Sequence, residues 1–151
     1  MFHSYMPTAL LEAKKALKKN EIPIGAIIVN PATKEIIAKS HNLTKTNNNP
    51  LAHAEINAIQ DACSKLQQFR LDGFDLYTSL EPCAMCAAAI AAARIKRLYF
   101  ALKDDKYGAV ISNLDFFNSS ACHHKVDYYY GFNEMEAKEL LQEFFQKKRK
   151  S

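Results

Sequence analysis

The feature that most constrains the fold is an alternation of short, β-branched apolar runs with longer segments of helical period. Apolar runs rich in Ile, Val, Tyr and Phe predict β-strands at residues 22–30, 35–40, 74–82, 95–102 and 125–131. Apolar residues at helical spacing predict α-helices at residues 6–19, 52–66, 83–94 and 134–148. Strands that alternate with helices in this way predict an α/β fold, in which a mixed five-stranded sheet carries helices on both faces.

Two long connections interrupt this order of elements. Residues 41–50 form a polar, Asn-rich loop that is long enough to be functional. Residues 103–124 are irregular and have room for one short helical piece. Pro82 is expected to stop the third strand and open the next helix, and Asn133 is expected to cap the last helix.

Size and composition indicate one soluble domain that covers residues 1–151. The chain is 48% apolar and 24% charged, and no apolar run reaches the roughly 20 residues that a membrane-spanning helix needs. The Lys-rich start at residues 6–19 could be a transit peptide, but Glu12 and the regular helical period favour a helix of the domain. Four cysteines without a secretory signal indicate a reduced, cytoplasmic protein, in which Cys63 and Cys122 are small buried residues.

Basic residues gather near both ends of the chain, which has a net charge of +4. They are Lys14, Lys15, Lys18 and Lys19 near the start, and Lys147, Lys148, Arg149 and Lys150 at the end. A basic tail of this kind can attract the phosphates of a nucleic acid. It can equally be a solvated helix end that the helix dipole favours, so charge alone leaves both interpretations open.

The stretch "LEPCAMCAAAI" at residues 80–90 places Cys83 and Cys86 three residues apart, directly after a proline. A C-x-x-C pair at a strand-to-helix turn is typical of redox proteins, and half of a structural zinc site gives the same pattern. A closed four-cysteine site would need both isolated cysteines as well. A catalytic zinc site needs only three protein ligands, because water takes the fourth position.

The third ligand candidate is His53 in "LAHAEINA", which is followed two residues later by Glu55, in the first helical turn after Pro50. Cys83 and Cys86 share one face of their helix and can close on one ion. His53 and Glu55 point in nearly opposite directions, so one can bind a metal while the other reaches the substrate. Zinc bound by one imidazole and two thiolates activates water, and a carboxylate outside the ligand set can shuttle the proton. Such a site suits the hydrolytic loss of ammonia from a purine or pyrimidine ring.

Each of these residues has an ordinary explanation when it is taken alone. His53 could be a core or surface histidine, Glu55 could compensate the helix dipole, and the two cysteines could be a redox pair. The combined pattern, H-x-E followed by P-C-x-x-C with both motifs opening helices, is much more specific. It is the signature of zinc deaminases that act on nucleobases.

With these motifs the chain resembles the bacterial tRNA-specific adenosine deaminases of the cytidine-deaminase superfamily over nearly its whole length. The resemblance also rests on "EIPIGA", "HN" at residues 41–42, "FRL", "ARI", "KDDKYGAV" and "LLQEFFQKKR". It implies a three-layer α/β/α fold, one Zn²⁺ per subunit bound by His53, Cys83 and Cys86, and Glu55 as the catalytic proton shuttle. The implied reaction converts adenosine to inosine at the wobble position of a tRNA anticodon, usually of an arginine tRNA. The implied assembly is a homodimer.

The resemblance also implies how RNA is bound. Asn42 would contact the flipped nucleotide, and Ile22 and Pro23 would line the base pocket. The loop that embraces the anticodon would contain Asp104 and Lys106. The last helix would meet RNA through Phe144, Phe145 and the basic tail. From its apolar pattern alone, at least one of these two phenylalanines is expected to pack against the sheet.

Two regions depart from the pattern of this family and affect what it implies for RNA. Tyr107 stands where the family has a smaller residue, and residues 119–125 follow no clear pattern. The Ala-rich residues 87–94 fit either a close dimer contact or packing on the sheet.

Two alternative functions remain open from the sequence. A zinc deaminase of a free base or nucleoside, such as guanine or cytosine, would act on small substrates and be indifferent to tRNA. A zinc-binding or redox module without catalysis would have no use for a carboxylate such as Glu55 beside its metal.

Overall fold

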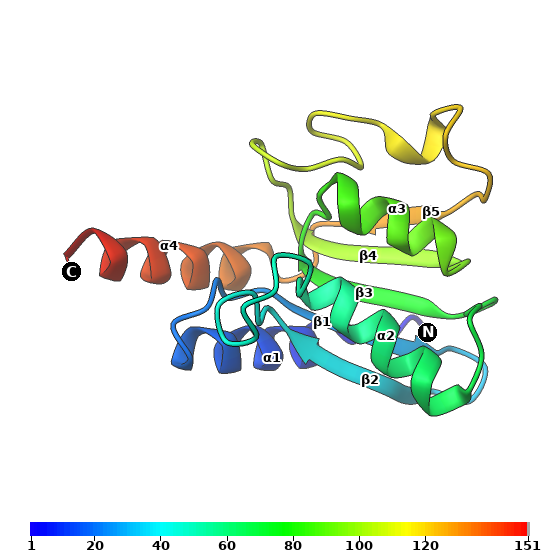
Figure 1. Ribbon diagram of the computed structural model, residues 1–151, viewed down its shortest axis with the longest axis horizontal. Coiled ribbons are helices and arrows are strands. Elements are labelled where there is room, and N and C mark those ends of the chain that lie inside the picture. The colour runs from blue at the N-terminus through cyan, green and yellow to red at the C-terminus, as the bar shows by residue number, and fades with distance from the viewer. Residues whose placement is uncertain (151) are drawn as a thin grey trace.

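The computed structural model describes residues 1–150, and its centre is a five-stranded sheet (Figure 1). The strands are β1 (Gly25–Asn30), β2 (Glu35–His41), β3 (Asp75–Leu80), β4 (Arg97–Leu102) and β5 (Asp127–Tyr130). They lie in the order β2-β1-β3-β4-β5, where β1 is antiparallel to both of its neighbours and β3, β4 and β5 are parallel. The predicted mixed sheet is therefore confirmed.

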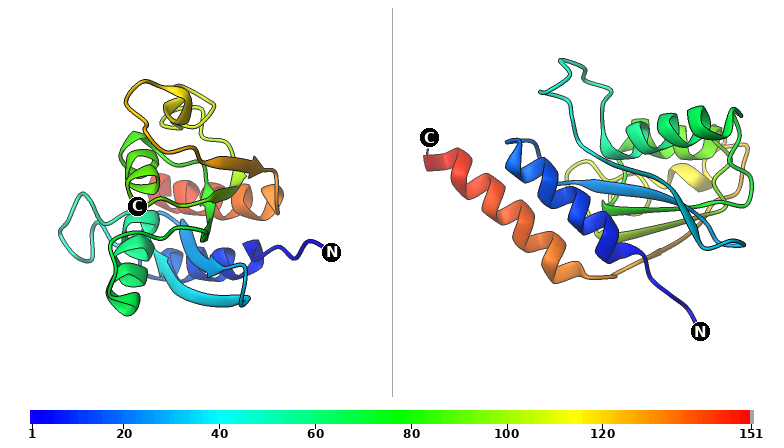
Figure 2. Two further views of the ribbon diagram at one scale, coloured as in Figure 1. Left: turned by 90° about the vertical axis from the view of Figure 1, so that its right-hand side faces the viewer. Right: turned by 90° about the horizontal axis from the view of Figure 1, so that it is seen from below.

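Two pairs of helices cover the two faces of the sheet, as the side views show (Figure 2). One face carries α1 (Met6–Lys18) and α4 (Glu134–Lys150), and the other carries α2 (Ala54–Leu66) and α3 (Ala84–Ala92). Because successive strand residues point to opposite faces, Ile27 packs with Met6 and Leu10 of α1, while Ile28 belongs to the core under α2 and α3. The predicted three-layer α/β/α architecture is confirmed.

The first helix packs unusually close to the sheet at Gly25. A Cβ atom at this position would collide with the carbonyl oxygen of Ala9 and with the backbone nitrogen of Ala13. Glycine is therefore required by the close approach of two backbones, which explains its place at the start of β1.

Most predicted elements form close to their expected bounds, but the first strand is shorter than predicted. It begins at Gly25 and not at residue 22, because Pro23 has no N–H group for a sheet ladder and Ile24 N donates locally to Ile22 O at 2.8 Å. The short helical piece in the irregular segment is a 3₁₀ turn at Phe116–Asn118. Asn133 does precede α4, but its side-chain amide donates to the Glu136 carboxylate at 3.0 Å.

The strand directions bring several connections to one end of the sheet. Residues 42–53, here called the 42–53 loop, lead from β2 into α2, and residues 81–83 lead from β3 into α3. Residues 103–113, here called the 103–113 loop, follow β4 at the same end, since β4 is parallel to β3. Figure 1 shows both loops beside the first turns of α2 and α3.

None of the helices in residues 1–150 is long and apolar enough to cross a membrane.

Candidate active site

Three side chains that are far apart in the sequence meet where α2 and α3 begin. His53 Nδ1 lies 3.7 Å from Cys83 Sγ and 3.5 Å from Cys86 Sγ. The ligand atoms of the three residues all lie within 4.8 Å of one another. Cys86 is fully buried, and His53 and Cys83 are half-buried, so the cluster opens to solvent on one side. One imidazole and two thiols in this arrangement could hold a metal ion.

His53 and Cys83 stand just before their helices and not within them, which corrects the sequence interpretation. His53 is the N-cap of α2, with φ −70° and ψ 153°, and Cys83 is the N-cap of α3, with φ −75° and ψ 177°. The His53 side chain accepts no hydrogen bond from its own helix, whereas the backbone N–H of Cys86 in α3 helps to lower the pKa of Cys83. The first N–H groups of both helices therefore add partial positive charge near the cluster, which favours thiolates.

The two thiols have strongly different affinities for a proton because they lie so close together. A hydrogen bond from Cys86, with help from His53, lowers the pKa of Cys83 to about 4. The hydrogen bond to Cys83 in turn raises the pKa of Cys86, and burial raises it further. Two adjacent thiolates repel each other, so both can ionise together only when a cation lies between them.

Glu55 lies one residue inside α2 and is 4% exposed. Its carboxyl group is not part of the three-residue cluster, but it interacts electrostatically with Cys83 and His53. Burial raises the pKa of Glu55 to about 7. A carboxyl group with a pKa near the working pH can both accept and return a proton efficiently.

Asn42 lies directly after β2 and is hydrogen-bonded to the two residues that flank the predicted pocket residues Ile22 and Pro23 in the sequence. Its backbone N–H donates to Ile24 O at 3.1 Å, and its side-chain amide donates to Glu21 Oε1 at 3.2 Å. Leu43 N donates to Ala52 O at 3.0 Å, so the 42–53 loop closes on itself between Asn42 and His53. The predicted substrate residue and the predicted metal ligand are thereby brought to the same end of the sheet.

Glu21 is buried and fastens the 42–53 loop through its carboxylate. Besides Asn42, it accepts hydrogen bonds from the Lys45 N–H at 3.3 Å and from the N–H and hydroxyl of Thr46 at 2.6 and 2.7 Å. Burial alone would raise the pKa of Glu21, but these hydrogen bonds together hold it below its usual value. The loop is therefore tied to the segment that precedes β1.

Glu81 has the same function for the 103–113 loop. Its carboxylate is 2% exposed and accepts hydrogen bonds from the backbone N–H groups of Asp104, Val110, Ile111 and Ser112 and from the Ser112 hydroxyl. Burial would raise the pKa of Glu81, but the hydrogen bonds outweigh it and keep the pKa low. Since Glu81 stands two residues before Cys83, the loop is attached directly to the segment between β3 and α3 that leads into the His–Cys–Cys cluster.

The predicted RNA-contact residues Asp104 and Lys106 lie in this loop and differ in their environment. Asp104 Oδ1 accepts from Lys106 N at 3.0 Å and from Tyr107 N at 3.2 Å, so its side chain shapes the turn. Lys106 is exposed, and its Nζ lies 5.1 Å from the centre of the Tyr107 ring.

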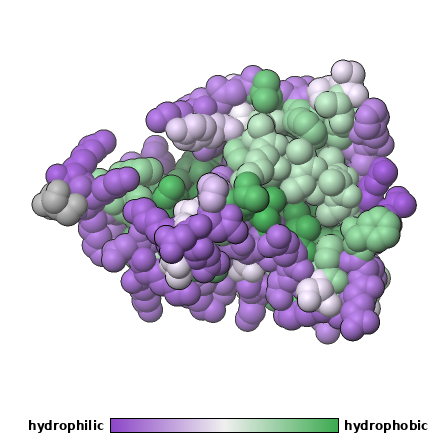
Figure 3. Space-filling view, in the orientation of Figure 1, coloured by the Kyte–Doolittle hydropathy of each residue, from purple (hydrophilic) through white to green (hydrophobic). Residues whose placement is uncertain are grey.

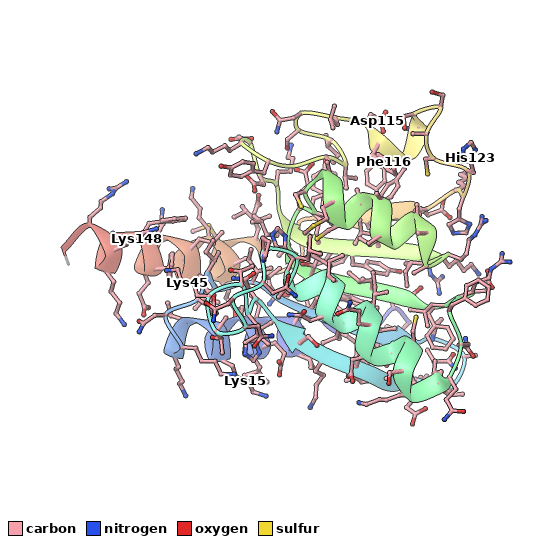
Figure 4. All side chains as sticks on the ribbon, in the orientation of Figure 1. Lys15, Lys45, Asp115, Phe116, His123 and Lys148 are labelled. Carbon is pink, nitrogen blue, oxygen red and sulfur yellow. The ribbon has the colours of Figure 1, made fainter. Side chains whose placement is uncertain are left out.

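The last helix approaches the 42–53 loop through Phe144. Phe144 is 7% exposed and lies beside Leu17 and beneath Lys45, whose Nζ is 5.7 Å from the ring centre. Phe144 belongs to neither apolar core of the sheet. The sequence predicts that at least one of Phe144 and Phe145 packs against the sheet, whereas Phe144 is buried between α4, α1 and the 42–53 loop. Phe145 is 45% exposed and contacts Phe144. Figure 4 shows Lys45 and Lys148 toward the same end of the molecule; the Lys150 side chain of the predicted basic tail lies outside the described residues.

Sequence reasoning did not identify Glu21, Glu81 and Asn57 as residues of the site. Asn57 donates from its side-chain amide to His41 O at 2.9 Å and to Ala52 O at 3.2 Å, which joins α2 to both ends of the 42–53 loop. The sequence does contain a signal for the two glutamates, because each stands next to an apolar strand. A charge that is buried there needs hydrogen-bond partners, so such a residue is a candidate for fastening a loop.

One cavity of the molecule lies away from this cluster. A cavity of about 540 Å³ lies at the opposite ends of β3 and β4, lined by Phe2, Tyr77, Tyr99 and the Asp75–Arg97 ion pair among others. It contains no group of metal-ligating side chains, so within the described residues the chemistry points to the His–Cys–Cys cluster.

Comparisons with known proteins identify the family of this chain. The sequence model of the MafB19-like deaminase family matches residues 2–149. A tRNA-specific adenosine deaminase from Agrobacterium fabrum is 50% identical over 145 residues, which cover 96% of this chain and 94% of that protein. Its counterpart from Rickettsia typhi is 48% identical over 144 residues, 95% of this chain and 97% of that protein.

A solved structure from studies of A-to-I editing by tRNA deaminases at the wobble position of transfer RNA is similar in fold and sequence. It superposes with a TM-score of 0.88 at 50% identity and covers 91% of this chain and 98% of that one. The chain therefore belongs to the MafB19-like deaminases, in the branch represented by relatives named tRNA-specific adenosine deaminase.

Proposed function

We propose that the protein is a zinc-dependent hydrolase that converts adenosine to inosine at the wobble position of a tRNA anticodon, in particular of an arginine tRNA. The observation that carries the proposal is the cluster of His53, Cys83 and Cys86 with the buried carboxyl of Glu55 beside it. The names of the relatives that match nearly the whole chain support the same reaction.

The cluster fits one Zn²⁺ ion per subunit. Zinc binds cysteine sulfur at about 2.3 Å and histidine nitrogen at about 2.0 Å, so a tetrahedral site sets such ligand atoms about 3.5 to 3.8 Å apart. The separations of 3.7 and 3.5 Å between His53 Nδ1 and the two sulfurs agree with this spacing. The ion would also allow both thiols to ionise, which their mutual repulsion otherwise opposes.

Deamination replaces the exocyclic amino group of the adenine ring with oxygen from water and releases ammonia. Zinc, when bound, supplies a Lewis acid that makes a neighbouring water molecule a stronger acid. Glu55 accepts a proton from the attacking water and delivers it to the departing amino group. Because it is buried, the carboxyl group is basic enough to accept the proton from water. The same burial keeps bulk water away while the proton passes to the amino group.

The substrate is held by residues around the cluster. Asn42, which Glu21 fixes, contacts the flipped nucleotide, and Ile22 and Pro23 line the pocket for its base. Asp104 and Lys106 contact the anticodon loop from the 103–113 loop. Phe145 and the basic end of α4 contact the RNA outside the pocket, where Lys and Arg provide attraction to phosphates.

The functional assembly is a homodimer in the cytoplasm. Figure 3 shows hydrophobic residues gathered over the face that carries α3. Ala84, Ala88 and Ala92 are exposed on α3, and such small side chains allow close approach of a second backbone. Contiguous apolar surface of this kind is typical of protein–protein interfaces.

The proposal is tested by incubating zinc-loaded protein with a tRNA that carries adenosine at the wobble position. Free adenosine, cytidine and guanine are incubated in parallel, and the products are measured as inosine in digested RNA and as released ammonia. We expect inosine at the wobble position of the tRNA and no turnover of the small substrates. Ammonia from a free base without editing of tRNA would indicate a free-base deaminase, and no product at all would indicate a non-catalytic metal module.

A further inference from the structure

Tyr107 is a large aromatic residue at the exposed tip of the 103–113 loop. Its side chain is 62% exposed, and within the described part of the chain its ring stacks on no other aromatic ring. Among the described residues its ring lies beside Lys106, whose ammonium group is 5.1 Å from the ring centre. Most of the ring surface is therefore available to a ligand.

The backbone that carries Tyr107 is held firmly on both sides. Asp104 Oδ1 accepts a hydrogen bond from the Tyr107 N–H at 3.2 Å, and Gly108 N donates to Asp104 O at 2.9 Å. The five hydrogen bonds to the Glu81 carboxylate fix the loop before and after this turn. An aromatic ring on a fixed turn loses little conformational freedom when it binds, so contact with a ligand is not offset by ordering of the loop.

The same turn lies close to the metal cluster. Ala109 N donates to Pro82 O at 2.8 Å, and Pro82 directly precedes Cys83. Tyr107 is therefore two residues away from a backbone hydrogen bond that joins its loop to the cluster. A nucleotide whose base occupies the cluster would bring its neighbours along the strand to the surrounding surface, where Tyr107 stands.

We propose that Tyr107 stacks on an unpaired nucleobase that directly neighbours the deaminated nucleotide, and so contributes to substrate selection. Every nucleobase has a flat π-face, and stacking on tyrosine needs no particular hydrogen-bond pattern. The Lys106 ammonium group beside the ring adds attraction for the negatively charged strand. This inference rests on the proposed function, since it assumes a single-stranded RNA segment at the cluster.

The experiment uses an anticodon stem-loop with adenosine at the wobble position and the zinc-loaded full chain. Tyr107→Ala, Tyr107→Phe and the wild type are compared by single-turnover kinetics and by fluorescence anisotropy of labelled RNA. Stacking of one base contributes roughly 5- to 150-fold in binding, so Tyr107→Ala should weaken binding and raise KM within this range, with little change in kcat at saturation. Tyr107→Phe keeps the ring and should remain within about twofold of the wild type.

Two controls separate stacking from a general effect on the protein. Phe69→Ala removes an aromatic side chain that is 83% exposed and lies between α2 and β3, at the end of the sheet away from the cluster; it should change nothing. Stem-loops with an abasic site on the 5′ or on the 3′ side of the edited nucleotide remove the partner base. With one of these two RNAs, Tyr107→Ala and the wild type should bind equally.

The proposal is overturned if Tyr107→Ala binds the intact stem-loop as the wild type does. It is also overturned if neither abasic RNA removes the difference, or if Tyr107→Ala changes the oligomeric state in gel filtration, which would make Tyr107 a subunit contact. If the wild type binds the stem-loop but deaminates none of it, the proposed function fails, while the anisotropy data still decide the role of Tyr107.

Discussion

His53 and Cys83 owe their positions to backbone that is not yet helical. Both are N-caps with extended ψ angles, so each side chain projects toward the neighbouring helix start instead of following the helix surface. Glu55, two residues after His53, is already helical and lies buried beside the cluster. The change in backbone conformation between residues 53 and 55 therefore lets the His53 imidazole and the Glu55 carboxyl group face the same region.

At this scale we predict that Glu55→Gln retains the metal and the fold but loses turnover. Loss of a positioned acid–base group reduces rates by roughly 100- to 10,000-fold, whereas the amide replaces the carboxyl at nearly the same volume. His53→Ala should instead lose the metal, as measured by elemental analysis of the purified protein. Glu35→Gln, at an exposed position with the same change in charge, should behave as the wild type. Near-normal turnover of Glu55→Gln would refute the assigned role.

Two loops around the cluster are each fastened by one buried carboxylate, which lies just before β1 in one case and just after β3 in the other. Glu21 fastens the 42–53 loop and Glu81 fastens the 103–113 loop, mainly through backbone N–H groups. The Glu81 carboxylate leaves no room at Gly108, where a Cβ atom would overlap it. The position of the 103–113 loop thus depends on a glycine as well as on a charge.

For this element we predict that Gly108→Ala displaces the Glu81 carboxylate and with it the loop. Overpacking of a buried site costs about 1–3 kcal/mol, and loss of loop position should lower turnover on RNA beyond any loss of stability. Gly73→Ala is the matched control, because Gly73 has φ +83° but open space around it. It should cost about 1–2 kcal/mol through backbone strain and leave turnover unchanged. Urea denaturation and single-turnover rates distinguish the two variants, and equal rates for both would contradict the prediction.

In the molecule as a whole, several buried carboxylates hold separate segments together. Glu12 pairs with Lys15 and His41, which joins α1 to the end of β2, while Glu21 and Glu81 fasten the two loops. Burial would raise the pKa of each of these three groups, but hydrogen bonds and nearby charges outweigh it and keep each pKa below its ordinary value. Their stabilising effect therefore depends on their remaining ionised.

We predict from these pKa values that the fold loses stability in acid. In the unfolded chain the carboxyl groups take up protons near their ordinary pKa of 4.5, whereas in the folded protein they do so only at lower pH. The contribution of these three groups to the free energy of unfolding should therefore be constant above this range and fall as the pH falls through their folded pKa values. Urea denaturation between pH 7 and 3 measures this decline.

Glu21→Gln supplies the comparison for the acid prediction. It should be less stable than the wild type at pH 7. The difference should narrow in acid, because there the wild type also loses the negative charge of Glu21. Glu35→Gln should keep a constant difference from the wild type. Release of a bound metal in acid affects all three proteins alike, so only a difference between Glu21→Gln and the wild type that stays constant in acid would contradict the prediction.

Much of the fold could be predicted because its signals are local. The helical period of residues 6–19 and the apolar run before Asn30 specify their elements within a few residues along the chain. The spacing of Cys83 and Cys86 likewise identified two donors on one helix start. The first strand was predicted too long because periodicity does not register the missing N–H group of Pro23.

The sequence by itself determined the element order, the mixed sheet and the chemical types of the site residues, because these follow from backbone geometry and side-chain chemistry over short spans. Only the tertiary structure decided that His53 Nδ1 lies 3.5 to 3.7 Å from both sulfurs, and that Glu21 and Glu81 fasten the loops. The same holds for the burial of Glu55, which raises the pKa of its carboxyl group to about 7. The tertiary structure also decided that Phe144 packs beside α1 and the 42–53 loop. These contacts join residues tens of positions apart, and their distances are set by how the two helix layers pack on the sheet, which no local pattern encodes.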